Sequence, residues 1–184
     1  MEFYPVDDKR WPDLVRLFEH HGNPGYCWCM RWRARGGAFL KLKTDGRREA
    51  LRHQVRTGIP VGIIGYLDGD PVAWCSVAPR ETYAALEHSR ILKRIDDAPV
   101  WAIVCLYLDR RIRGQGLTPR VLSAAVDYAL AQGATIVEGY PVDRASRGSG
   151  SYMWMGLPAA FREAEFQEVA RPGTGRYIMR YTAS

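Results

Sequence analysis

The most informative stretch of this sequence is Leu106-Tyr107-Leu108-Asp109-Arg110-Arg111-Ile112-Arg113-Gly114-Gln115-Gly116-Leu117, in which an apolar strand leads through two glycines into a long amphipathic helix. Gly114 and Gly116 carry no Cβ, so the backbone can approach an anion closely. The first N–H groups of the following helix lack intrahelical partners, and the helix dipole is positive at that end. Together with Arg111 and Arg113, these donors predict a site for a pyrophosphate group.

Two common nucleotide-binding motifs do not fit this stretch. No Lys-Ser or Lys-Thr pair follows the glycines, as a P-loop requires, and no third glycine completes a dinucleotide-binding fingerprint. The run Arg111-Ile112-Arg113-Gly114-Gln115-Gly116 instead resembles the Q/R-x-x-G-x-G/A signature of the GNAT N-acetyltransferases. In that family the turn binds the pyrophosphate of acetyl-CoA, so the resemblance implies acetyl-CoA as co-substrate.

Length and composition are typical of one globular domain. The chain has 184 residues, of which 47% are hydrophobic and 25% charged, and this is enough to bury a sizeable core. No apolar run approaches the roughly 18 residues of a membrane span. The N-terminal segment lacks the basic and apolar regions of a signal peptide. We therefore expect a single domain over residues 1–184, a cytoplasmic location and no membrane partner.

The formal net charge of +6 has two interpretations. Scattered surface arginines and lysines account for most of such a value. The cluster of Arg110, Arg111, Arg113 and Arg120 beside the glycine turn also suits a polyanionic cofactor such as coenzyme A. The net charge and the arginine cluster do not require a nucleic acid, so we do not expect one as a partner. A homodimer is left open.

The four cysteines are few for this length and do not form a disulfide framework, so reduced thiols are expected. A zinc site is not expected, because a Cys-x-Cys pair with a His-His pair lacks the usual ligand spacing. Covalent catalysis is not expected either, since Cys75 and Cys105 lie in apolar runs with no histidine nearby. The residues considered for zinc are His20, His21, Cys27 and Cys29.

The periodicity and turn signals predict an alternating order of helices and strands. An Asp-Gly-Asp turn at 68–70 predicts a hairpin. The near-continuous apolar run at 100–108 predicts a central strand with both faces covered. The expected elements are an edge strand at 3–6, helices at 11–20 and 46–57, strands at 61–67, 71–77 and 100–108, a helix at 118–132, a strand at 135–140, a helix at 157–164, and strands at 168–170 and 176–181.

This order resembles the GNAT order over nearly the whole chain. The resemblance implies an α/β single-domain GNAT fold, with a mixed central sheet and helices on both faces. It also implies a V-shaped splay between strand 100–108 and strand 135–140, in which the pantetheine arm of the cofactor lies. Two further segments, Cys27-Trp28-Cys29-Met30 and Trp74 to Arg80, resemble those of a poorly characterised bacterial subgroup of the family, as does Tyr140-Pro141-Val142-Asp143.

The resemblance also implies which residues contact the cofactor. Leu106 and Leu108 take the pantetheine positions, and a backbone N–H near Cys105 to Tyr107 would polarise the thioester carbonyl by stabilising the oxyanion. The expected cofactor-binding residues are Leu106, Tyr107, Leu108, Arg111, Arg113, Gly114, Gln115, Gly116, Leu117 and Thr118.

The catalytic groups are less clear from the sequence. An attacking amine must lose a proton, and Glu138 is the first candidate base, with Asp143 as the second. An ion-pair partner or an exposed charge is an equal interpretation of Glu138. The family often has a tyrosine acid in the last helix, but Phe161 occupies that place and cannot donate a proton. Tyr140 or Tyr152 could substitute, although packing is the commoner role of such tyrosines.

The acceptor wall of the GNAT fold is formed by the first helices and their loop. By position, Tyr26, Trp28 and Trp32 are therefore candidate substrate-binding residues, with packing against the sheet as the equal alternative. Arg80 is a candidate for binding an anionic substrate group, although a surface ion pair is the commoner role.

The resemblance implies an N-acetyltransferase that moves an acetyl group from acetyl-CoA to a primary amine of a small molecule by direct attack. Two alternatives remain open at this point. The acceptor could be the amine of a protein or an aminoacyl-tRNA, in which case binding should weaken steeply with salt for tRNA. The chain could also be a non-catalytic sensor that binds acyl-CoA, a reading to which the absent family tyrosine gives some weight.

Overall fold

The computed structural model describes residues 1–19, 24–143, 153–173 and 175–183. Predicted helices and strands are all present, and their bounds differ from the expected ones by at most two residues. In chain order the elements are β1 (Glu2–Pro5), α1 (Trp11–Glu19), η1 (Pro24–Tyr26), α2 (Met30–Arg33), α3 (Gly36–Lys41), α4 (Thr44–Arg56), β2 (Ile63–Leu67), β3 (Asp70–Pro79), η2 (Arg80–Thr82), α5 (Ala84–Glu87), β4 (Trp101–Leu108), η3 (Arg110–Ile112), α6 (Thr118–Ala131), β5 (Ile136–Gly139), η4 (Met153–Met155), α7 (Pro158–Glu163), β6 (Gln167–Ala170) and β7 (Ile178–Thr182).

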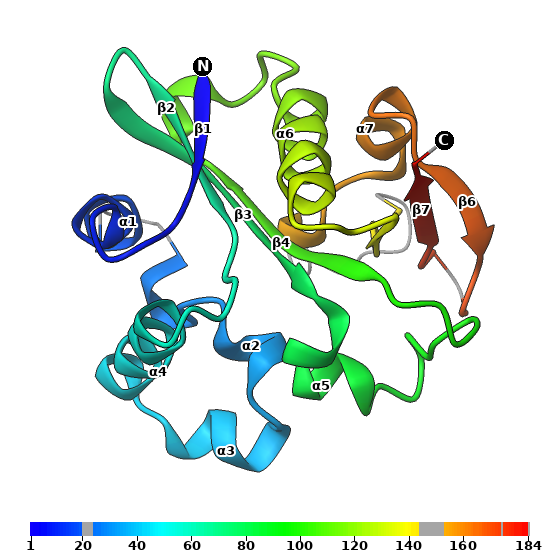
Figure 1. Cartoon of the computed structure of the whole chain (residues 1–184), viewed down its shortest axis with the longest axis horizontal. Helices are drawn as coiled ribbons and strands as arrows, with labels where there is room; N and C mark the ends of the chain where they lie inside the picture. Colours follow the sequence, from blue (N-terminus) through cyan, green and yellow to red (C-terminus); the bar gives the residue numbers. More distant parts are fainter. Residues whose placement is uncertain (20–23, 144–152, 174, 184) are drawn as a thin grey trace.

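A single mixed sheet runs through the centre of the molecule (Figure 1). Within the described residues it has seven strands in the order β1-β2-β3-β4-β5-β7-β6. Only β4 and β5 pair in parallel, and every other neighbouring pair is antiparallel. The intervening helix α6 makes the crossover that a parallel pair requires. The expected mixed sheet and parallel pair are therefore confirmed.

The β2–β3 hairpin and β4 follow directly from their local sequences. Asp68 and Gly69 have φ values of +51° and +83°, as the favoured two-residue hairpin turn requires. Every residue from Ala102 to Tyr107 is buried. This agrees with the apolar run that predicted a central strand.

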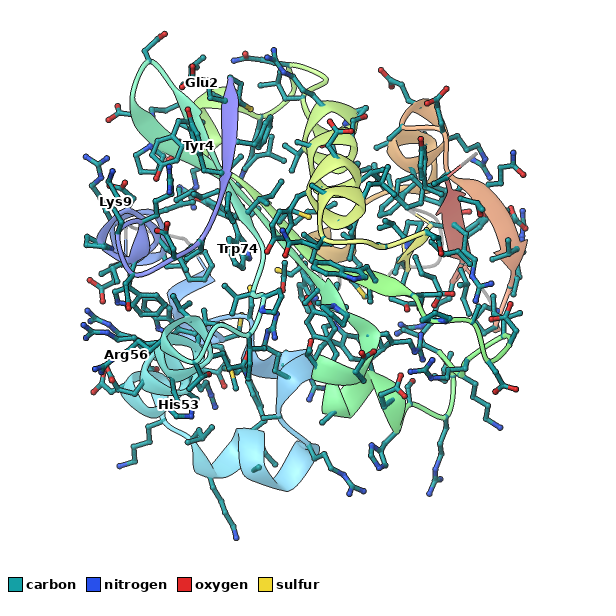
Figure 2. The ribbon with its side chains drawn as sticks, viewed as in Figure 1. Glu2, Tyr4, Lys9, His53, Arg56 and Trp74 are labelled. Atoms are coloured by element: carbon teal, nitrogen blue, oxygen red, sulfur yellow. The ribbon has the colours of Figure 1, made fainter. Side chains whose placement is uncertain are left out.

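Helices cover both faces of the sheet (Figure 1). On one face α1, α2 and α4 pack on the strands, and Leu51 of α4 joins the same buried cluster as Trp74 of β3. On the other face α6 and α7 pack on the strands, and Leu122 of α6 joins the same cluster as Ile103 of β4. Trp74 lies deep in the interior, whereas the exposed His53 lies on the outer side of α4 (Figure 2).

The end of α7 closes in a Schellman motif that lacks its usual glycine. The amide of Phe166 donates to the carbonyl of Phe161 at 3.0 Å, and the amide of Glu165 donates to that of Arg162 at 3.0 Å. The rings of Phe161 and Phe166 meet edge to face with their centroids 5.0 Å apart. Glu165 has a φ of +65°, in the left-handed region where glycine is preferred.

Helices α2, α3 and α5 were not predicted. Helix α3 begins with Gly36 and Gly37, which are poor helix formers. Trp28 and Cys29, which precede α2, have positive φ values of 46° and 49°, and no local sequence pattern indicates these values. In the described part of the chain, no helix has the length and apolarity needed to cross a bilayer.

Candidate functional site

Pairing between the two parallel strands stops at one end, which leaves the last part of β4, its open edge, without a paired strand on its β5 side among the described residues. The β4–β5 register runs from Trp101 opposite Val137 to Ile103 opposite Gly139. Strand β5 ends there, whereas β4 continues for five more residues to Leu108. The pairing therefore ends where the resemblance places the splay.

The antiparallel ladder with β3 fixes which backbone groups face this open edge. The amide of Asp109 donates to the carbonyl of Val72 at 2.7 Å, so position 109 points toward β3. The backbone N–H and C=O groups of successive residues point to opposite sides of a strand. Those of Leu106 and Leu108 therefore point away from β3. The carbonyl of Leu108 accepts from Arg113 Nε at 2.7 Å. The amide of Leu106 is therefore a donor at the open edge.

Beyond β4, the glycine turn forms an open cradle of amide groups. Gly114 and Gly116 have φ values of +76° and +68°, and a Cβ at either position would meet no protein atom within 4 Å. Among the described residues, no acceptor is found for the amides of residues 114–118. Left-handed glycines, free amides and the start of the 14-residue helix α6 together fit a diphosphate group.

The side chains around the cradle divide into two groups. Arg113 lies over the ring of Tyr107, with its Cζ 5.3 Å from the ring centroid, which places a positive charge beside the open edge. Arg111 turns toward the carboxylates of Asp109, at 3.1 Å, and Asp70, at 3.5 Å. The side chain of Gln115 donates to the carbonyl of Arg111 at 3.1 Å. The geometry therefore offers Arg113 to a phosphate more readily than Arg111.

A cavity of about 430 Å³ adjoins the open end of β4. Residues of η1, α2, α3, β4 and η4 line it, together with Cys27 and Cys29. Its described lining residues are Tyr26, Cys27, Cys29, Arg31, Trp32, Phe39, Cys105, Leu106, Tyr107 and Trp154. Cys105, Leu106 and Tyr107 lie in the part of β4 beyond its pairing with β5, so the cavity adjoins that part of the strand.

The acceptor-wall candidates divide between this cavity and the core. Tyr26 and Trp32 line the cavity. Trp28 does not, because it is 1% exposed and stacks on Trp11 with the ring centroids 5.8 Å apart. Trp28 therefore has the packing role that the sequence left as its alternative. Phe39 and Trp154 line the cavity and were not expected, since neither belongs to a motif.

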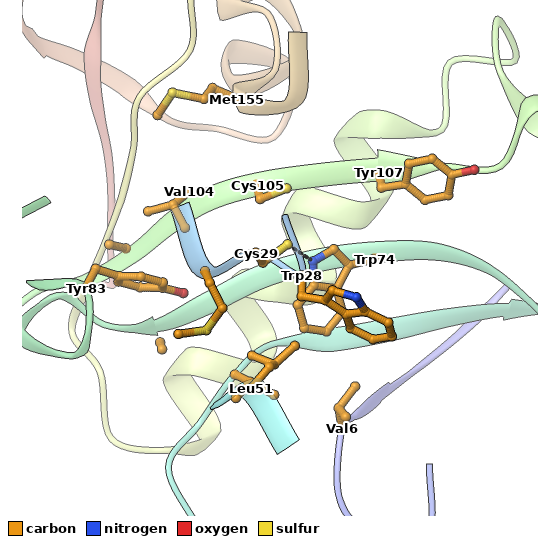
Figure 3. Close-up of a cluster of buried hydrophobic side chains, with 14 of the residues drawn as sticks. Val6, Trp28, Cys29, Leu51, Trp74, Tyr83, Val104, Cys105, Tyr107 and Met155 are labelled. Atoms are coloured by element: carbon orange, nitrogen blue, oxygen red, sulfur yellow. Dashed lines mark hydrogen bonds between the residues drawn. The ribbon is translucent and has the colours of Figure 1, made fainter. Parts of the chain in front are cut away.

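Three cysteines line the cavity, and two of them, Cys27 and Cys29, are held as neutral thiols. Trp74 Nε1 donates to Cys29 Sγ at 3.0 Å (Figure 3). Hydrogen bonding to Cys105 and burial hold the pKa of Cys29 well above its usual value. Hydrogen bonding to Cys29 and burial do the same for the pKa of Cys27. Both thiols therefore stay protonated near neutral pH and are poor nucleophiles.

The expected base, acid and anion-binding residues form one buried network instead of lining the cavity. Glu138 accepts from Arg80 at 2.9 Å and from Arg180 at 2.7 Å, one arginine on each carboxylate oxygen. The hydroxyl of Tyr140 donates to Glu138 at 2.5 Å and accepts from Arg80 at 2.6 Å. Burial and the charge of Glu138 raise the pKa of Tyr140 well above its usual value.

This placement favours the alternative interpretation that the sequence left open for each of these three residues. Arg80 is 1% exposed and also pairs with Glu87 at 2.6 Å, so its guanidinium is already engaged within the protein. Glu138 is the buried ion-pair partner that the sequence left as its alternative, and Tyr140 is bound to it. Neither is among the described cavity-lining residues. Tyr152 lies outside the described residues, and Asp143 is a half-buried residue beyond β5.

Residues 4–148 match the family model "Acetyltransferase (GNAT) family", which is most of the chain. The chain therefore belongs to this family, whose members are acyl-transferring enzymes. It is an acetyl-CoA-dependent acetyltransferase. No curated protein matches this sequence closely enough to count as a relative.

Solved structures share the fold at low sequence identity. The ribosomal-protein-alanine N-acetyltransferase from Brucella melitensis is 13% identical, with 99% of both chains covered and a TM-score of 0.55. The PaiA N-acetyltransferase from Thermoplasma acidophilum, solved in complex with coenzyme A, is 11% identical, with 98% of both chains covered and a TM-score of 0.54. An aminoglycoside 6'-N-acetyltransferase from Acinetobacter haemolyticus is 15% identical over 93% of this chain and 94% of that one, with a TM-score of 0.55. These likenesses concern the fold alone.

Proposed function

We propose that this protein transfers the acetyl group of acetyl-CoA to a primary amine of a small molecule by direct attack. The observation that carries the proposal is the cavity of about 430 Å³ beside the open edge of β4. A volume of this size suits a small-molecule site, since ligand pockets run from about 300 to 1,000 Å³. A partly enclosed cavity is less suited to a folded protein segment than an open groove.

Acetyl-CoA supplies the activated acetyl group as a thioester. The amides of residues 114–118 would hold its diphosphate, and Arg113 would add a positive charge beside them. Leu106 and Leu108 would contact the pantetheine arm along the open edge. The Leu106 amide would donate to the thioester carbonyl oxygen, where negative charge develops during attack.

The hydrogen bonds of Glu138 and Tyr140 with the buried arginines support a structural role for these two residues, not a catalytic one. Both hold β5 against β3 and β7 through the arginine network and so keep the closed end of the splay in place. Tyr152 remains a proposed acid for the departing thiolate. Tyr26 and Trp32 would contact the acceptor, because both line the cavity.

Turnover and binding measured together test this proposal. The protein is incubated with acetyl-CoA and a panel of small amines, and the free thiol of released CoA is measured. Acetyl-CoA binding is measured separately by calorimetry. We expect binding, together with thiol release that depends on at least one small amine.

Other outcomes identify the alternatives. Acetyl-CoA binding without thiol release from any amine would support a sensor. Release only with a peptide or an aminoacyl-tRNA would support a macromolecular acceptor. Either result contradicts the proposed small-molecule acceptor.

A further inference from the structure

The cavity beside β4 has a lining that selects among amines. Aromatic rings from five different elements face it, together with thiols and one leucine. Among the described lining residues there is no aspartate, glutamate or histidine, and the only charged side chain is Arg31. The aromatic residues are Tyr26, Trp32, Phe39, Tyr107 and Trp154.

The thiols of Cys27 and Cys29 do not supply the missing negative charge. The pKa values of Cys27 and Cys29 are raised by hydrogen bonding between thiols and by burial, so both groups are neutral near pH 7. The buried carboxylate of Glu138 is held by two arginines and is not among the described lining residues. The described surface of the cavity is therefore apolar, with one cation.

Such a surface disfavours polycationic acceptors. A polyamine or an amino sugar with several ammonium groups would lose hydration on entering the cavity without gaining a carboxylate partner. Arg31 adds like-charge repulsion. No ion-pair partner of Arg31 is found among the described residues, and its guanidinium lies over the ring of Phe39 at 5.6 Å from the centroid.

We propose that the acceptor is a monoamine attached to an aromatic body, such as an arylalkylamine, and that this cavity binds its ring. This inference rests on the proposed acetyltransferase function and names its substrate class. The aromatic walls would pack against the ring edge to face or in offset stacks. The volume of about 430 Å³ suits one or two fused rings with a short amine arm.

The same lining explains how the amine loses its charge. An apolar environment disfavours the ammonium form, so the acceptor binds there as the neutral amine. Its nitrogen lone pair forms the new bond to the acetyl carbon, and the carbon–sulfur bond breaks. The sulfur leaves with the electron pair of the carbon–sulfur bond and receives the proton that the nitrogen gives up. The products are the N-acetyl amine and the free CoA thiol.

Acceptor selectivity tests the proposal. Initial rates of thiol release give kcat/KM for 2-phenylethylamine and tryptamine, and for spermidine and kanamycin, under one set of conditions. We expect kcat/KM to be at least tenfold higher for the two aromatic monoamines. Equal or higher values for spermidine or kanamycin would overturn the substrate class and leave acetyl transfer itself intact.

A matched pair of charge reversals tests the role of the lining. Arg31→Glu places a carboxylate at the cavity, whereas Arg35→Glu makes the same change at an exposed position outside the lining. The ratio of kcat/KM for spermidine to that for 2-phenylethylamine should rise at least fivefold in Arg31→Glu and stay unchanged in Arg35→Glu. Equal ratios in the two variants would contradict the proposal.

Binding without turnover separates this inference from the proposed function. Calorimetry of the CoA-bound protein measures the affinity for 2-phenylethylamine and for spermidine. Preferential binding of 2-phenylethylamine with no thiol release would support the cavity assignment and contradict the transferase function. If 2-phenylethylamine binds no better than spermidine, the cavity assignment is wrong.

Discussion

Arg80 Nη1 lies 2.9 Å from Glu138 Oε1, and both side chains are only 1% exposed. Arg80 follows β3 in the chain and Glu138 lies in β5, so the pair joins two strands that flank β4. Arg180 of β7 binds the second oxygen of Glu138 at 2.7 Å. The ion pair thus holds the closed end of the splay, which positions the open end where acetyl-CoA is expected.

Removing the charge of Glu138 should destabilise the fold. In Glu138→Gln, two arginines lose their carboxylate, and breaking a buried pair costs about 3–5 kcal/mol in the free energy of unfolding. Urea denaturation measures this change. Glu168→Gln, which disrupts an exposed pair with Arg171, is the control and should change stability by less than about 1 kcal/mol. Unchanged stability of Glu138→Gln together with a large loss of kcat would instead identify Glu138 as a base.

Acid should weaken the same network through Glu87. Burial acts to raise the pKa of Glu87, but hydrogen bonds from Arg94 and Arg80 outweigh it and lower that pKa. A carboxyl whose pKa is lower in the folded state stabilises the fold above the unfolded-state value of about 4.3, and this stabilisation is lost as pH falls through the folded-state value. The stability difference between the wild type and Glu87→Gln should therefore shrink between pH 6 and pH 3, as urea denaturation can measure. Parallel pH curves for the two proteins would contradict this assignment.

Glycine at the end of α7 should stabilise the protein. Glu165 occupies the left-handed position of the Schellman motif with a φ of +65°. A left-handed conformation costs a non-glycine residue roughly 1–2 kcal/mol, part of which glycine loses again through its greater freedom in the unfolded chain. Glu165→Gly should therefore raise the free energy of unfolding by about 0.5–1 kcal/mol. The control Glu163→Gly, in the last helical position, should lower it by a similar amount, so a loss of stability in both variants would exclude this explanation.

Alanine in the cradle should weaken coenzyme A binding. In Gly114→Ala the new Cβ meets no protein atom, but it lies where the backbone is expected to approach the diphosphate, and φ is +76°. We expect the Kd for CoA, measured by calorimetry, to rise at least tenfold, which is about 1.4 kcal/mol. Gly133→Ala is the control, because it has the same open surroundings and a φ of +87° at the far end of α6. Equal Kd values for the two variants would mean that Gly114→Ala weakens CoA binding only through backbone strain and not through contact with the diphosphate.

Local sequence signals predicted the order of the elements and the cradle. The Asp68-Gly69 turn, the apolar run of β4 and the glycines at 114 and 116 each encode a backbone conformation within a few residues. The surroundings of individual side chains depend on distant segments and were harder to predict. Arg80 has a polar neighbourhood in the chain, yet its partners come from residues 87 and 138.

The cavity was predictable only in part for the same reason. Tyr26 and Trp32 were expected from the position of the acceptor wall in the fold. Phe39 and Trp154 lie on short helices that no periodicity predicts, and they meet at the cavity through tertiary packing. Trp28 and Cys29 have left-handed backbone conformations that no local pattern indicates, and the side chain of Trp28 is buried in the core.

A crystal structure of the protein with acetyl-CoA would examine the assigned cofactor site atom by atom. We expect diphosphate oxygens at hydrogen-bond distance, about 3 Å, from amides of residues 114–118, and the thioester carbonyl near the Leu106 amide. Acetyl-CoA bound elsewhere, or cradle amides that donate to protein groups while the cofactor is present, would contradict the assigned cofactor site.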